Sequence, residues 1–261
     1  MGILNVTPDS FSDGGRYAGI DAAVDRAAQL VEQGAAIVDV GGESTRPGAA
    51  AVDAVIEIER VAPVIERIVR RFDVAVSVDT RKPQVMAAAI AAGACIINDV
   101  YALRAPGARQ MAAATGVGVC LMHMQGEPRT MQVDPVYDDV VAAVASFLDA
   151  QRRACVAAGI DPQALVLDPG IGFGKSLAHN LRLLRELPTL AALGAPLLVG
   201  VSRKSMIGRL LGRDVGERLY GGLGLAALAV GKGAKIIRTH DVAPTLDAIR
   251  MVGAVMQGAD Q

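Results

Sequence analysis

The chain has 261 residues, a length that suits one α/β barrel of about 250 residues or two smaller domains. Hydrophobic residues make up 52% of it, aromatic residues only 3%, and Trp is absent, so Ala, Val, Leu and Ile must fill the core, as is typical of helices packed on parallel strands. With 26 basic and 27 acidic residues the formal net charge is -1, so no overall field attracts nucleic acid or an anionic membrane. A small molecule is therefore the expected partner.

The cysteines and the apolar stretches indicate the compartment. Cys95, Cys120 and Cys155 lie far apart in apolar surroundings and form no CxxC pair, which favours a reduced, cytoplasmic setting. The longest apolar stretches are shorter than the roughly 20 residues that span a bilayer, and the N-terminus has no basic segment followed by a long apolar one. We therefore expect neither an export signal nor a membrane span.

Eight short runs rich in β-branched residues are predicted as strands. In chain order they are GILNV (2–6), AAIVDVG (35–41), VAVSVDT (74–80), ACIINDV (94–100), GVCLMHM (118–124), ALVLDPG (164–170), PLLVGVS (196–202) and AKIIRTH (234–240). The segments between them have helical spacing, and four of these segments are closed by Gly34, Gly93, Gly159 and Gly233, where left-handed helix caps are expected.

Strand followed by helix, eight times, predicts the α/β class and a single (β/α)8 TIM barrel over residues 1–261. An open doubly wound sheet uses the same units and is the alternative. It usually has fewer strands and a glycine-rich phosphate-binding turn after the first strand, and that turn is missing here.

Polar residues stand at the end of nearly every predicted strand. In strand order they are Asn5, Asp39, Asp79, Asn98 with Asp99, His123, Asp168, Ser202 to Lys204, and Arg238 with His240. One or two of them could simply cap the following helix. Because the active site of such a barrel is built at the carboxyl ends of its strands, the full series predicts a site there.

The candidate site residues divide by charge. Asp39, Asp79, Asn98 and Asp168 offer acceptors for a ligand with several N–H donors, such as an amino-heterocycle. Lys204, Arg238 and His240 offer donors for an anion such as a phosphate. A catalytic or binding role is weighed against helix capping or structural ion pairing for five of the strand-end residues, namely Asp39, Asp79, His123, Asp168 and Lys204.

Several familiar patterns fail on closer reading. PGIGFGKS has Pro169 where a phosphate-binding P-loop needs its first glycine, and GLGLAA at 222–227 follows no strand. His123, His179 and His240 lack metal-ligand spacing, and no Gly-x-Ser-x-Gly elbow is present. A nucleotide site of these kinds, a zinc site and a hydrolase triad are therefore not expected.

The motifs taken together carry a resemblance. GILNVTPDSFSDGG, IVDVGGESTRPGA, VSVDTRKP, INDV, LMHMQGEPRTMQ, LDPGIGFGKS, GVSRKSMIG and IIRTHDV run in order from residue 1 to about residue 245, and this series resembles the dihydropteroate synthase family of bacterial folate biosynthesis. The resemblance implies a TIM barrel that condenses (7,8-dihydropterin-6-yl)methyl diphosphate with 4-aminobenzoate, giving 7,8-dihydropteroate and diphosphate with the help of Mg²⁺. Enzymes of that family are sulfonamide targets, because sulfonamides mimic 4-aminobenzoate.

The resemblance assigns roles to residues. It implies that Asp79, Asp168 and Lys204 are catalytic and that the pterin is held by Asp39, Asp79, Asn98, Asp168 and Lys204. Arg238, His240 and Asn5 would bind the diphosphate, and Asn5 would also reach the metal. Two loops, TPDSFSDGG and GESTRPGA, would close over the site, and the residues implied for the 4-aminobenzoate pocket are Phe11, Thr45, Arg46, Pro47, Phe173 and Ser205.

Two other functions would use many of the same residues. A pterin-binding methyltransferase would share the ring-binding carboxylates but would not need Arg238 and His240 to bind a diphosphate. A non-catalytic pterin-binding relative would be expected to lose Lys204 or a carboxylate.

The apolar segment GGLGLAALAVGKGA has two possible roles. It packs on the barrel, or it forms a homodimer face, which the resemblance favours. Met1 directly precedes the first strand, whereas family members usually have a short segment there. We expect either a barrel floor that is less well plugged than usual or a sequence from which that segment has been trimmed.

Overall fold

The computed structural model describes residues 1–7, 15–44, 51–127 and 130–258. Its centre is one parallel sheet in which every strand pairs with the next in the chain. The strands are β1 (Gly2–Asn5), β2 (Ile37–Gly41), β3 (Ala75–Asp79), β4 (Ile96–Asp99), β5 (Gly118–Met122), β6 (Leu165–Asp168), β7 (Leu197–Gly200) and β8 (Ala234–Arg238).

The sheet closes on itself between its first and last strands. A parallel bridge joins Gly2 to Thr239, the Ile3 N–H donates to the Thr239 carbonyl over 2.9 Å, and the Thr239 N–H donates back to the Met1 carbonyl over 3.0 Å. The predicted TIM barrel is therefore confirmed, and the open doubly wound sheet is wrong.

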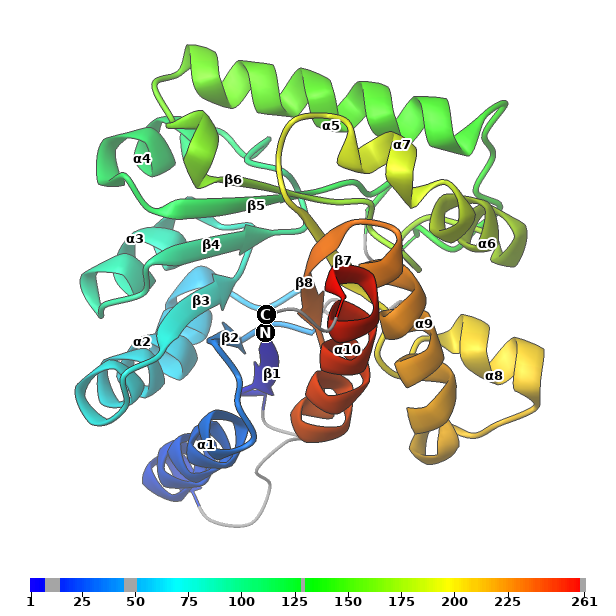
Figure 1. Cartoon of the computed structure of the whole chain (residues 1–261). Coiled ribbons are helices and arrows are strands. Elements are labelled where there is room, and N and C mark those ends of the chain that lie inside the picture. Colours follow the sequence, from blue (N-terminus) through cyan, green and yellow to red (C-terminus); the bar gives the residue numbers. More distant parts are fainter. Residues whose placement is uncertain (8–14, 45–50, 128–129, 259–261) are drawn as a thin grey trace.

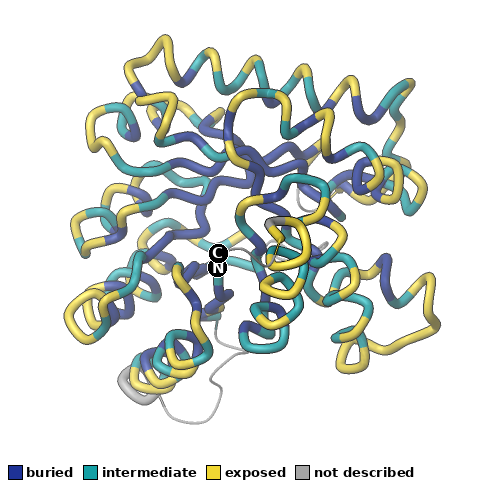
Figure 2. Tube along the Cα trace, in the orientation of Figure 1, coloured by how far each residue is buried: buried dark blue, intermediate teal, exposed yellow. Residues whose placement is uncertain are grey.

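Helices surround the barrel and connect its strands (Figure 1). They are α1 (Gly15–Glu32), α2 (Ala54–Arg71), α3 (Pro83–Ala91), α4 (Ala108–Thr115), α5 (Val140–Ala157), α6 (Leu177–Arg185), α7 (Leu187–Ala191), α8 (Ser205–Leu211), α9 (Leu219–Gly231) and α10 (Val242–Gln257). Figure 2 shows the strands buried and the outer helix faces exposed. Among the described residues, no helix combines the length and apolar character that a membrane crossing requires.

Helix α2 illustrates how the sequence forms these outer elements. The carboxylate of Asp53 accepts the Val55 N–H over 2.8 Å and so caps the first turn. Val61, Val64, Ile65 and Ile68 recur at helical spacing and are buried against the barrel.

The four glycines predicted to end helical segments confirm the left-handed caps. Gly34, Gly93, Gly159 and Gly233 have φ angles of 92°, 107°, 97° and 102°, a region that residues with a Cβ rarely adopt. The same turns return the chain to the start of the next strand.

Strand alternation decides which residues face the barrel axis. Side chains two residues apart share one face of a strand, so Val76 and Val78 on β3 share one face while Ser77 and Asp79 share the other. The register aligns Gly41 with Asp79 and Asp79 with Asn98 across β2, β3 and β4. The polar strand ends are thus brought to one level at the mouth of the barrel.

Candidate active site at the carboxyl ends of the strands

Arg238 is the centre of the polar network in the mouth. Its Nε donates to Asp39 Oδ2 over 2.7 Å, and its Nη2 donates to Asp79 Oδ2 over the same distance. Asn98 donates through Nδ2 to Asp39 Oδ2 over 3.0 Å. The guanidinium of Arg238, on β8, therefore reaches across the mouth to two carboxylates on β2 and β3. The sequence alone had instead grouped Arg238 with the anion-binding residues.

Each of the two carboxylates keeps one oxygen open. Among the described residues, no donor reaches Asp39 Oδ1 or Asp79 Oδ1, although both atoms are buried. Burial raises the pKa of Asp79 to about 7, against the opposing effect of Arg238. Buried acceptors without a partner are costly, so these oxygens are suited to the N–H donors of a bound ligand.

Asp168 and Lys204 form a second group on the other side of the mouth. Asp168 Oδ1 accepts the Gly170 N–H over 2.7 Å, and burial raises the pKa of Asp168 while that bond and Lys204 oppose the rise. Burial also lowers the pKa of Lys204 to about 8, against the attraction of Asp168. The Lys204 ammonium lies 4.1 Å from the centre of the Phe173 ring, a cation–π distance.

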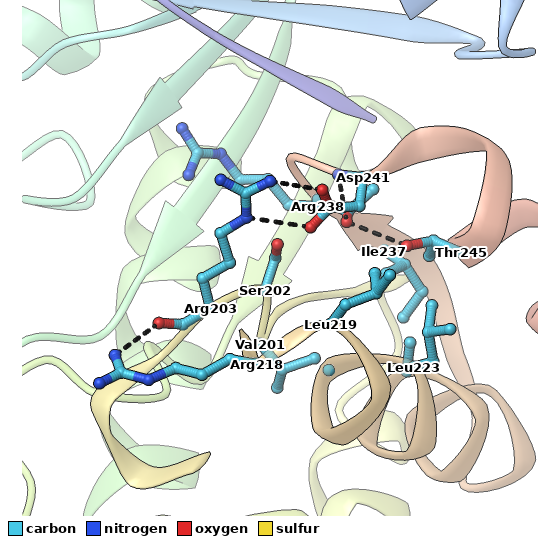
Figure 3. Close-up of a pocket in the computed structure, with 13 residues that line it drawn as sticks. Val201, Ser202, Arg203, Arg218, Leu219, Leu223, Ile237, Arg238, Asp241 and Thr245 are labelled. Carbon is cyan, nitrogen blue, oxygen red and sulfur yellow. Dashed lines mark hydrogen bonds and ion pairs between the residues drawn. The ribbon is translucent and has the colours of Figure 1, made fainter. Parts of the chain in front are cut away.

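The loop that carries Lys204 is tied to the end of β8 (Figure 3). Arg203 donates to both carboxylate oxygens of Asp241, over 3.1 and 2.5 Å. The Ser202 hydroxyl lies 3.0 Å from His240 Nδ1 and accepts the His240 N–H over 3.2 Å. Arg203 adopts a φ of 57°, uncommon for a residue with a Cβ, and Lys204 follows directly as the cap of α8.

Asn5 lies at the end of β1, where its side chain is exposed. A Cβ added to Gly41 would lie 3.8 Å from Asn5 Oδ1 and 3.7 Å from Asp79 Oδ2, so these two oxygens flank the space that the glycine leaves. Within the described ranges, no group of three or more His, Cys, Asp or Glu side chains could hold a metal ion by itself. Mg²⁺ is commonly held by one or two protein oxygens together with substrate phosphates. Asp79 Oδ2 already accepts from Arg238, so of these two oxygens Asn5 Oδ1 is the one that fits an ion of that kind.

Two of the strand-end residues, Asp99 and His123, make structural contacts and do not join the polar network. Asp99 accepts the backbone N–H groups of Tyr101 and Leu103 over 2.7 and 2.8 Å, which stabilises the turn after β4. His123 is buried with Nδ1 3.0 Å from Lys175 Nζ, and burial with the Lys175 charge lowers the pKa of His123 to about 3. Both residues shape loops around the mouth.

The 4-aminobenzoate residues implied by the resemblance are only partly described. Phe173 lies under Lys204, and Ser205 begins α8 with an exposed side chain. Phe11, Thr45, Arg46 and Pro47 lie outside the described residues. Sequence reasoning missed Lys175, whose only signal was PGIGFGKS, a pattern dismissed as a failed P-loop.

Comparison with known proteins gives a consistent result. The family model for pterin binding enzymes matches residues 1–240. The dihydropteroate synthase of Escherichia coli K12 is 53% identical over 260 residues, covering 100% of this chain and 92% of the relative. That of Haemophilus influenzae is 48% identical over 251 residues, covering 96% and 91%.

Solved structures agree. Yersinia pestis dihydropteroate synthase in a sulfonamide drug complex has a TM-score of 0.94 at 50% identity and covers 99% of this chain and 94% of its own. The Xanthomonas albilineans enzyme with 4-aminobenzoic acid has a TM-score of 0.94 at 52% identity, covering 99% and 93%. With full-length matches in both sequence and structure, the chain belongs to the dihydropteroate synthase family of pterin-binding enzymes.

Proposed function

We propose that the mouth of this barrel joins (7,8-dihydropterin-6-yl)methyl diphosphate to 4-aminobenzoate, giving 7,8-dihydropteroate and diphosphate. The observation that carries the proposal is the pair of buried carboxylates, Asp39 and Asp79, which keep open oxygens beside Arg238. Relatives support it, because the Xanthomonas albilineans enzyme has also been solved in complex with 7,8-dihydropteroate.

The pterin is assigned to the carboxylate side of the mouth. The open oxygens of Asp39 and Asp79 accept ring N–H groups, and Asn98 is held next to them by its bond to Asp39. Asp168 and Lys204 complete the set from β6 and from the loop after β7. Ionising the C–O bond spreads positive charge into the pterin, so Asp79 and Asp168 act as catalytic residues by stabilising that charge electrostatically.

The diphosphate is assigned to Arg238, His240 and Asn5. When the C–O bond breaks, its electron pair leaves with the diphosphate, and Arg238 and Lys204 are the cations near the developing negative charge. We include Mg²⁺ in the proposal, with Asn5 as its ligand from the chain. Such an ion, bound together with the diphosphate, would neutralise part of the leaving group's charge.

The second substrate needs positioning more than activation. The amino group of 4-aminobenzoate is an uncharged nucleophile that loses a proton after attack, and a well-oriented reactant pair gains most of its rate from geometry. Phe173 and Ser205 flank Lys204 in the chain's fold, and the proposal adds Phe11, Thr45, Arg46 and Pro47 from the two loops implied by the resemblance. Lys204 then lies between the two substrates.

We also propose that the protein works in the cytoplasm and that it forms a homodimer. Cys95, Cys120 and Cys155 are free thiols, which suits a reducing compartment. Helix α9 is almost wholly apolar, yet only Ala226 and Ala229 are buried.

Next to those buried alanines the same region exposes large apolar side chains. Tyr220 and Leu228 lie exposed on α9, and Met251, Val255 and Met256 lie exposed on the neighbouring α10. An apolar surface of this kind favours a partner, and we assign it to a second copy of the chain.

Turnover tests the reaction itself. The purified protein should release diphosphate only when both 4-aminobenzoate and Mg²⁺ are supplied with the pterin substrate. A sulfonamide should inhibit this release, and added 4-aminobenzoate should relieve the inhibition competitively. Diphosphate release that does not depend on 4-aminobenzoate, or inhibition that 4-aminobenzoate does not relieve, would contradict the proposal.

Replacement of Lys204 tests its catalytic role. Lys204→Ala should reduce turnover about 100-fold or more, since a half-buried charge close to the reacting groups is lost, while the far-UV circular dichroism stays that of the parent. Lys232→Ala is the matched control, because the Lys232 ammonium donates to the Arg185 carbonyl at the exposed end of α6. Turnover of Lys204→Ala within a few-fold of the parent would remove Lys204 from the mechanism.

The pH dependence of pterin binding tests Asp79. Burial raises the pKa of Asp79 to about 7 in the free protein, and a carboxylate that accepts ligand N–H groups must be ionised. Affinity for a pterin whose own charge is constant should therefore be full above pH 7 and fall up to about tenfold per pH unit below it. Calorimetric titrations between pH 5.5 and 8.5 check this, and Asp79→Asn should lose the pH dependence along with most of the affinity.

Light scattering on a sizing column tests the homodimer. The parent should elute at twice the chain mass of 26.9 kDa, and Leu228→Glu should shift it to one chain mass, because the new carboxylate would be buried without a partner in the interface. Val133→Glu, at a residue exposed after β5, is the control and should leave the mass unchanged. A parent that elutes as a single chain overturns the dimer.

A further inference from the structure

Lys175 is a buried lysine whose contacts are almost all carbonyl oxygens. Its side chain is only 2% exposed, and no carboxylate pairs with it in the part of the chain that the structure describes. Nζ donates to the carbonyls of Phe173 over 2.9 Å, Gly170 over 3.0 Å and His123 over 3.2 Å. It also lies 3.0 Å from His123 Nδ1.

Three glycines give the loop after β6 the shape that surrounds this ammonium. Gly170, Gly172 and Gly174 have φ angles of 65°, 86° and 61°. A Cβ on Gly170 would lie 1.9 Å from the His123 carbonyl oxygen, and one on Gly174 would lie 2.4 Å from the Gln125 carbonyl oxygen. The arrangement inverts a P-loop, in which backbone N–H groups surround a phosphate, because here backbone carbonyls surround the loop's own lysine.

Further hydrogen bonds fix the rest of the loop backbone. Gln132 donates to the Gly172 carbonyl over 2.5 Å and Tyr137 donates to the Gly174 carbonyl over 2.8 Å. The Phe173 N–H donates to the Gly170 carbonyl over 3.0 Å. The position of Phe173 is therefore set at both its N–H and its carbonyl, and Lys175 provides the contact on the buried side.

This loop presents two of its side chains to Lys204. The Phe173 ring lies under the Lys204 ammonium, and Asp168, at the start of the loop, is oriented by the Gly170 N–H. We propose that Lys175 is a positioning residue for the reaction: by holding the Gly170 and Phe173 carbonyls it sets the Phe173 ring against Lys204. This inference rests on the proposed function, because it assigns Phe173 to the 4-aminobenzoate pocket.

A role in stability alone explains the lysine less well. Burying an ammonium without a carboxylate is unfavourable. An apolar side chain of similar length would avoid that cost, but it would leave the carbonyls of Gly170, Phe173 and His123 without the donor that holds them. Burial does lower the pKa of Lys175 to about 7, although Asp168 favours its charged form. What the ammonium supplies and a methionine cannot is a set of donors directed at several carbonyls at once.

A double-mutant cycle tests the proposal. In the parent, Lys175→Met should raise the KM for 4-aminobenzoate at least tenfold and leave the KM for the pterin diphosphate within threefold. In a Phe173→Ala background the same replacement should change the KM for 4-aminobenzoate less than twofold, because the ring that Lys175 positions is gone. Lys232→Met is the control lysine and should leave both constants within twofold of the parent.

Several outcomes would overturn it. If the increases in the KM for 4-aminobenzoate caused by Lys175→Met and by Phe173→Ala multiply in the double variant, Lys175 does not act through Phe173. The same conclusion follows if Lys175→Met has the KM values of the parent. If Lys175→Met does not fold, Lys175→Gln replaces it. Because its amide can donate to two carbonyls, it should raise the KM for 4-aminobenzoate less than tenfold but at least threefold, and this increase should again fall below twofold in the Phe173→Ala background. Failure of both variants to fold would leave Lys175 with a structural role only and would overturn the proposal. A parent without turnover would instead contradict the proposed function.

Discussion

The ion pairs of Arg238 with Asp39 and Asp79 are the constraint on which the mouth of the barrel depends. Strand alternation forces inward side chains to share a small space, and two carboxylates there would repel each other without a cation between them. Arg238 reaches them from β8, so the network spans the point where the barrel closes. The planar guanidinium suits this task because one group can donate to both carboxylates at once.

Arg238 satisfies only one oxygen of each carboxylate, and the remaining oxygens can bind a ligand. Asp39 and Asp79 each keep an open oxygen, Asp79 has its pKa raised to about 7 and Lys204 has its pKa lowered to about 8. Such groups lower the stability of the free protein, and a ligand with complementary donors restores the missing interactions. Stability is commonly given up in this way at preorganised sites.

The sequence predicted the barrel, the glycine helix caps and the strand ends that deliver the polar residues, because these follow from local spacing. It could not predict which side chains meet. Arg238 pairs with Asp39 across 199 positions, and charge alone had grouped it with the anion-binding residues. Asp99 follows Asn98 directly, yet a shift of one residue turns its side chain out of the barrel and into a turn. Lys175 was hidden because its partners are backbone carbonyls, which carry no sequence signal.

Arg238 and Lys175 show how the same type of charge serves two purposes. The Arg238 side chain is 21% exposed and its partners have open oxygens, so a bound substrate can share or replace its contacts. The Lys175 ammonium is buried and donates to the backbone carbonyls of Gly170 and Phe173. A ligand in the mouth therefore cannot compete for these hydrogen bonds. The first cation is placed where binding changes its partners. The second is placed where only the shape of the loop depends on it.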